Sequence, residues 1–168
     1  APEAANDVIR QVASAHGAIV VESQRALAQA SRDGIIGDEL LSDHVHPTAR
    51  GYFVLADAFY DAIAESGRLG AFPRRVDVDT AWVRRPLCEL DRIAGDRVAA
   101  GLRSQWPFKP NAARPSIPDT DPLGPLASRW LAEEITWTKA MLEALELARA
   151  RGDTRDAACI AHDLAATD

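Results

Sequence analysis

Cysteine, methionine and long apolar runs are scarce in this sequence of 168 residues. It holds two cysteines and one methionine, and no apolar run approaches the ~18–20 residues that a membrane-spanning helix needs. Positive charge is also short, since 19 Lys and Arg face 25 Asp and Glu for a net charge of -6. This balance argues against a nucleic-acid-binding protein, which would need a basic face for phosphates. The start at Ala1-Pro2-Glu3 has no signal-peptide pattern, and the location of the protein stays open.

The two cysteines, Cys88 and Cys159, lie far apart in segments that are predicted to be helical. Their separation gives no metal-binding spacing and no basis for a disulfide. We therefore expect two buried or half-buried free thiols. Hydrophobic residues make up 47% of the chain, which is enough for a packed core.

The first 70 residues alternate between helical and extended patterns. Apolar spacing predicts helices over 6–16 and 23–32, and the β-branched run Ala18–Glu22 between them predicts a strand buried on both faces. Pro47 is expected to open a further helix, because proline is favoured at a first helical position. The apolar stripe of that helix is Tyr52, Leu55, Ala56, Phe59, Tyr60 and Ile63, and Gly67 and Gly70 follow as left-handed caps. Helix, buried strand, loop and helix predict the end of an α/β sandwich.

Composition changes after residue 70. Apolar spacing predicts helices over 87–104, 126–150 and 154–166, the last two joined as a hairpin at Gly152-Asp153. Six prolines within residues 107–125 exclude a regular helix there and predict an extended strap. The expected organisation is therefore a first domain over 1–70, a connecting helix and strap over 71–125, and a helical hairpin over 126–168.

Asp43 and His46 form the most informative pair. They are three residues apart, in a loop that ends where a helix begins. A serine esterase needs a neutral imidazole beside a hydroxyl group, and a carboxylate on the other ring nitrogen to fix the tautomer. One turn of backbone can hold both groups at this spacing. His46 is therefore the candidate general base, and Asp43 its orienting carboxylate.

The block from Asp43 to Tyr52, which includes Pro47 and Gly51, resembles the last motif of SGNH/GDSL-type serine hydrolases. The resemblance covers roughly residues 5–66 and implies that the chain is the C-terminal piece of a three-layer α/β/α sandwich with a flavodoxin-like fold. It implies that Asp43 and His46 are the catalytic Asp and His, and that the full-length protein acts on an ester. An acylated carbohydrate or a lipid is the candidate substrate. The tail resembles the tetratricopeptide-like helices that a subgroup joins to this domain.

Other parts of the family pattern are missing from the sequence. Gly37-Asp38 is followed by Glu39 instead of serine and lies too close to Asp43 to be the nucleophile block. The oxyanion glycine and the Gly-x-Asn-Asp block are absent, and Asn6-Asp7 is read as an ordinary helix cap. Without a nucleophile and an oxyanion hole, the chain alone is expected to be inactive on simple esters.

Two alternatives stay open. His44 and His46 form a His-x-His pair that could bind a metal ion, but His16 and His162 are remote and give no third ligand. No metal ion or cofactor is therefore expected. The rival function is a non-catalytic interaction module whose helical tail binds a protein partner. Because the predicted strand lacks neighbours, the isolated chain is also expected to be poorly stable or to require a partner.

Overall fold

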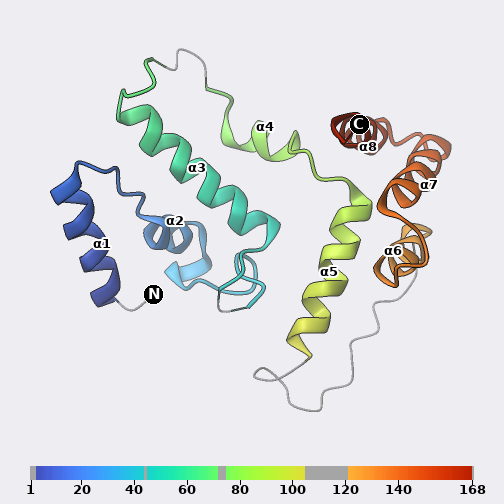
Figure 1. Cartoon of the computed structure of the whole chain (residues 1–168), viewed down its shortest axis with the longest axis horizontal. Coiled ribbons are helices and arrows are strands. Elements are labelled where there is room, and N and C mark those ends of the chain that lie inside the picture. Colours follow the sequence, from blue (N-terminus) through green and yellow to red (C-terminus); the bar gives the residue numbers. More distant parts are fainter. Residues whose placement is uncertain (1–2, 44, 72–74, 105–120, 168) are drawn as a thin grey trace. The chain divides into compact units, whose positions relative to one another are not determined.

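The computed structural model describes residues 3–43, 45–71, 75–104 and 121–167. These residues form eight α-helices, one short 3-10 helix and no β-strand (Figure 1). The chain divides into two compact units, Ala1–Val83 and Arg84–Asp168. The three domain ranges that the sequence suggests remain predictions.

The predicted α/β sandwich is wrong, because the described residues are helical and contain no sheet. Residues 18–22 are an extended link between α1 (Glu3–His16) and α2 (Ser23–Ala30). A strand needs the N–H and C=O groups of a neighbouring strand, and the described residues hold only one isolated β-bridge, between Leu41 and Pro47. A β-branched run without such a neighbour is not a strand, and the flavodoxin-like layer arrangement fails with it.

In the first unit, α2 is followed by the 3-10 helix η1 (Arg32–Gly34), α3 (Ala49–Glu65) and α4 (Val78–Val83). The start of α3 is set by Thr48, whose side chain accepts a hydrogen bond from the Gly51 N–H at 3.1 Å. Pro47 therefore lies just before the cap instead of opening the helix. Gly67 follows the last turn with φ of 63°, the left-handed conformation that the sequence predicts there.

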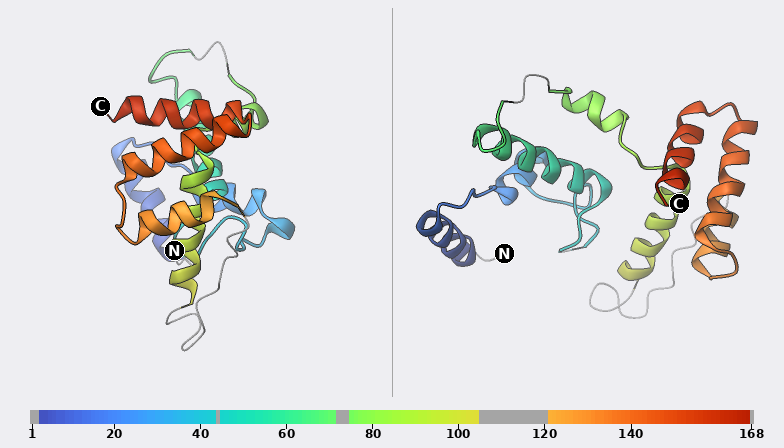
Figure 2. Two further views of the ribbon diagram at one scale, coloured as in Figure 1. Left: turned by 90° about the vertical axis from the view of Figure 1, so that its right-hand side faces the viewer. Right: turned by 45° about the horizontal axis from the view of Figure 1, so that its top comes forward.

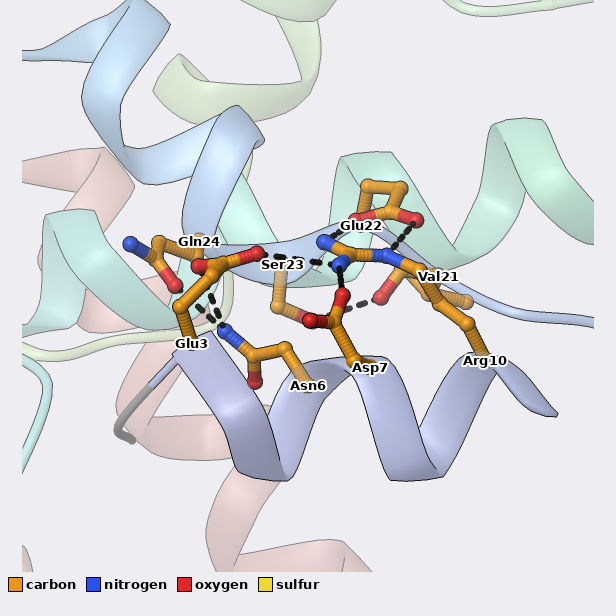
Figure 3. A network of polar contacts seen from close by, with 8 residues as sticks. All are labelled: Glu3, Asn6, Asp7, Arg10, Val21, Glu22, Ser23 and Gln24. Carbon is orange, nitrogen blue, oxygen red and sulfur yellow. Dashed lines mark hydrogen bonds and ion pairs between the residues drawn. The ribbon is translucent and has the colours of Figure 1, made fainter. Parts of the chain in front are cut away.

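Polar side chains hold α1 against the start of α2. Arg10 of α1 donates two hydrogen bonds to the Glu22 carboxylate, both of 3.0 Å (Figure 3). The same guanidinium reaches Glu3 and Asp7 at 2.9 Å. All of these charges are substantially exposed, so the contact orients α1 without adding much stability.

The second unit contains α5 (Glu89–Arg103), α6 (Leu123–Leu131), α7 (Trp137–Ala150) and α8 (Thr154–Ala166). Figure 2 shows α7 and α8 side by side as a hairpin, and the Asp153 side chain caps α8 by accepting from the Asp156 N–H at 3.0 Å.

One helix was expected over 126–150, but the chain breaks between α6 and α7. Glu133 adopts φ of 59°, and Thr136 caps α7 by accepting from the Lys139 N–H at 3.2 Å. Trp130 and Trp137 therefore lie on different helices. Of the predicted proline strap, residues 107–120 lie outside the described residues, and the part from 123 to 125 is the first turn of α6.

The core of the second unit is continuous across its four helices. α5 packs on α6, α6 on α7 and α7 on α8. The buried cluster consists of Cys88, Leu90, Ala94, Leu123, Leu126, Ala127, Ile135, Ala140, Met141, Ala144, Leu145, Ala148 and Ile160. This all-helical packing fits the expected tetratricopeptide-like tail only loosely.

Both cysteines are free, as expected: Cys88 is buried and Cys159 is half-buried. Burial, followed by the hydrogen bond to Asp91, raises the pKa of the Cys88 thiol. Burial also raises the pKa of the Cys159 thiol. No helix among the described residues is both long and apolar enough to span a membrane.

Candidate functional site

The loop that carries Asp43 and His46 is closed by backbone hydrogen bonds. The Ser42 N–H donates to the His46 carbonyl at 2.7 Å, and the Thr48 N–H donates to the Leu40 carbonyl at 2.9 Å. Leu40 itself is buried. The loop is therefore a closed turn that is fixed at both ends.

Gly51 allows this loop to approach the first turn of α3. A Cβ atom at position 51 would collide with the Leu40 carbonyl oxygen and would crowd Pro47. Glycine is therefore required by a close backbone approach and not by an unusual φ angle. The glycine that follows the Asp-x-x-His sequence is therefore explained in this chain by packing.

Asp43 accepts three hydrogen bonds. Its Oδ1 accepts from the N–H groups of Val45 and His46, each at 2.7 Å, and its Oδ2 lies 2.7 Å from Nδ1 of His46. The Val45 N–H, the His46 ring and the His46 N–H together hold the pKa of Asp43 well below its usual range. Because an ionised carboxylate only accepts, the Nδ1 atom of His46 donates in this contact, and Nε2 is the acceptor in the neutral form of the ring.

The His46 ring is open to solvent. Its side chain is 67% exposed, whereas that of Asp43 is 11% exposed. Within the described residues, no hydroxyl group is hydrogen-bonded to Nε2 of His46. The expected Asp43–His46 distance is met, but the catalytic role of the pair stays a prediction. His44, and with it the His-x-His alternative, lies outside the described residues.

Asn6 and Asp7 do not form part of this site. Both lie inside α1, so they are not the helix cap that the sequence suggested. The Asn6 side chain donates to Gln24 at 2.7 Å and belongs to the polar contacts between α1 and α2 (Figure 3).

A second feature is the outward side of α3, formed by Tyr52, Ala56, Phe59 and Ile63, which we name the α3 outer face. These residues recur at spacings of four, three and four, so they lie on one side of the helix. All four are exposed, with Tyr52 at 60% and Phe59 at 50%. An amphipathic helix normally buries this side. Four of the six residues in the apolar stripe that the sequence analysis identified are therefore exposed, while Leu55 and Tyr60 are half-buried.

The opposite side of α3 carries charged residues together with apolar ones. It borders a groove of about 570 Å³ between α2 and α3, whose lining includes Glu22, Asp57, Asp61 and Glu65. Arg75 pairs with Asp57 at 2.6 Å and with Asp61 at 2.7 Å. The charged residues of α3 thus lie on the side that borders the groove, mixed with apolar ones, whereas the α3 outer face carries no charge.

The helix α1 repeats this arrangement. Val8, Ile9 and Val12 are all exposed, whereas Arg10 is directed at Glu22 of the neighbouring segment (Figure 3). Both long helices of the first unit therefore expose several large apolar side chains.

The comparisons with known proteins support no family. No protein-family model matches the chain, and neither the curated proteins nor the solved structures yield a similar one. Together with the missing sheet, this result overturns the expected membership in the SGNH/GDSL-type hydrolases, while the role of the Asp43–His46 pair stays untested.

The outward direction of the α3 stripe was missed at the sequence level. Helical spacing shows that an apolar side exists, but not which neighbour covers it. The sequence did hold one indication of this exposure. With a single predicted strand beside it, a helix as long as α3 has too few apolar neighbours in the first unit to cover its apolar side.

Proposed function

We propose that this chain is a helical protein-interaction module that binds its partner through the α3 outer face. The observation that carries the proposal is the exposure of Tyr52, Phe59 and Ile63 on one side of α3. Burying a large apolar side chain contributes about 1.5–3 kcal/mol. Since these three side chains are 60%, 50% and 37% exposed, covering them would contribute part of that amount for each.

The partner is a protein surface with an apolar centre and a basic rim. None of the four residues of the α3 outer face is charged. A charged residue of the partner placed against this face would be buried without a counterion, so the centre of the partner surface should be apolar. Residues 1–83 hold seven Arg and no Lys against twelve Asp and Glu, a net charge of -5. A basic rim would complement this charge and speed association.

Site-specific photo-crosslinking tests the proposal. A photoreactive phenylalanine analogue at position 59 should give one defined adduct in the producing cell. The same analogue at Leu69, another exposed apolar position of this unit, is the matched control and should give none. The cross-linked protein, once identified and purified, should bind the chain, and Phe59→Ala should weaken binding about tenfold or more, as expected for a central apolar anchor.

Two results would refute the module. One is the absence of an adduct at position 59. The other is the same set of adducts from positions 59 and 69, which would indicate non-specific apolar contact.

A second candidate function rests on the 2.7 Å contact between Asp43 and His46. Here the pair would be the proton-transferring half of an ester-cleaving site whose hydroxyl nucleophile comes from outside this chain. His46 would take the hydroxyl proton at Nε2, and Asp43 would stabilise the imidazolium.

The second candidate has its own test in the assembly that supplies the nucleophile. His46→Ala should lower ester turnover by ~10⁴ or more, and Asp43→Asn should also lower it severely because it favours the wrong tautomer. Full turnover in a well-folded His46→Ala protein would exclude this role and leave the interaction module.

A further inference from the structure

Cys88, Asp91 and Asp163 bring one sulfur atom and two carboxylates together in the second unit. One ligand atom from each lies within 4.8 Å of the other two. Cys88 is the N-cap of α5, Asp91 lies in the first turn of that helix, and Asp163 belongs to α8. Zinc bonds of about 2.0–2.3 Å can be reached from this arrangement with small side-chain adjustments.

A fourth carboxylate gives an independent sign of a cation. Asp156 is only 8% exposed, and its Oδ1 accepts from the N–H of Glu89, the residue after Cys88, at 2.8 Å. Its Oδ2 is buried and has no hydrogen-bond partner in the described part of the chain. Buried carboxylate oxygens are normally paired with a donor or bound to a metal ion. This oxygen therefore points to a positive ligand at the start of α5.

Basic side chains offset the local negative charge only in part, since Arg151 acts on Asp156 without forming an ion pair with it. Within the described residues Asp91 and Asp156 form no ion pair. Asp91 accepts a hydrogen bond from the Cys88 thiol at 3.0 Å, and Asp163 pairs with His162 at 3.2 Å. Arg92, next to Asp91 in the chain, is paired with two other carboxylates. Three acidic groups thus lie near a thiol, and in the described part of the chain no arginine or lysine forms an ion pair with any of them.

We propose that Cys88, Asp91 and Asp163 form a binding site for Zn²⁺, with the Asp156 carboxylate beside it. A sulfur ligand excludes Mg²⁺ and Ca²⁺, which bind through oxygen, whereas Zn²⁺ accepts both thiolate and carboxylate. On binding, the Cys88 S–H bond breaks, its proton leaves to solvent and an S–Zn bond forms, with no change in oxidation state. The ion ties the first helix of the unit to the last.

The test uses the full purified chain under reducing conditions and Co²⁺ as a spectroscopic substitute for Zn²⁺. The wild-type chain should bind one Co²⁺ with a thiolate-to-cobalt charge-transfer band in the near ultraviolet, and Zn²⁺ should displace it. Cys88→Ser should lose the band. Cys159→Ser, which removes the other thiol of the same unit, should keep it.

Asp163→Asn gives a readout that does not depend on replacing a buried residue. Its side chain is partly exposed, so the helices should stay folded by circular dichroism while metal affinity falls about tenfold or more. Failure of the folded wild-type chain to give the band at one equivalent of Co²⁺ would overturn the site. A band that survives in Cys88→Ser, or an unchanged affinity in folded Asp163→Asn, would overturn it as well.

Discussion

Among the residues that the structure describes, the second unit buries thirteen in one cluster across four helices, whereas the buried hydrophobic residues of the first unit are Ala13, Leu27 and Leu40. Exposure runs the other way. Among the described residues, twelve large hydrophobic side chains are exposed in the first unit and four in the second. Both units are built from amphipathic helices, so the difference lies in what covers their apolar sides. The second unit supplies that cover itself, and the first does not.

Charge follows the same division. Residues 84–168 hold twelve Lys and Arg against thirteen Asp and Glu, a net charge of -1, compared with -5 for residues 1–83. A self-covered and nearly neutral unit suits a scaffold. A charged unit with exposed apolar sides suits recognition.

The largest contrast should appear when one apolar side chain is truncated in each unit. Met141 is fully buried in α7, so Met141→Ala should cost about 2–5 kcal/mol through lost contacts and a cavity. Phe59 is half exposed on α3, and Phe59→Ala in the free chain should cost under about 0.5 kcal/mol. Hydrogen exchange of the α7 and α3 amides measures both effects separately. Equal losses of stability in Met141→Ala and Phe59→Ala would show that the first unit has a core of its own.

A second contrast compares two glycines that lie in helices. Gly51→Ala places a Cβ against the Leu40 carbonyl and should destabilise the loop and the start of α3 by about 1–3 kcal/mol. Gly95→Ala in α5 meets nothing within 4 Å and should stabilise that helix by about 0.5–1 kcal/mol. Thermal unfolding followed by circular dichroism distinguishes the two signs. A neutral Gly51→Ala would mean that the loop is not held against α3.

Local sequence patterns predicted the helices well. They failed where contacts with distant parts of the chain determine the structure. Helical spacing found the segments that became α1, α3, α5 and α8, and the left-handed end at Gly67 followed from glycine's conformational freedom. The break between α6 and α7 was missed, because Glu133 carries no glycine-like signal for its positive φ. The strand at 18–22 failed for a different reason: a strand exists only through a neighbour that the sequence pattern cannot supply.

The candidate site was predicted in part. Spacing alone placed Asp43 and His46 in one turn, because the loop geometry is local and the two residues are three apart. The proposed metal site could not be predicted from the sequence, since Cys88 and Asp163 are separated by most of the second unit and meet only when α5 and α8 fold together.

The smallest expected effect is an acid-dependent change in the Asp43 loop. In an unfolded chain an aspartate ionises near pH 4, and the folded pKa of Asp43 is lower because the Val45 N–H, the His46 ring and the His46 N–H stabilise its charge. The stability that the ionised Asp43 carboxylate gives to the loop is therefore complete above about pH 4, and it is lost as the pH falls toward the folded pKa of Asp43. The Val45 and His46 amide signals should shift on acidification in wild type. The shift should disappear in Asp43→Asn, and its persistence there would assign it to another group.

Hydroxyl-radical footprinting tests the contrast between the units most directly. In the purified chain, Tyr52, Phe59 and Ile63 should be oxidised as readily as the exposed Leu69, whereas Met141 should be protected. In the producing cell, where the partner is present, Tyr52 and Phe59 should become protected several-fold while Leu69 stays reactive. Equal oxidation of the α3 outer face in the cell and in the purified chain would contradict the interaction module.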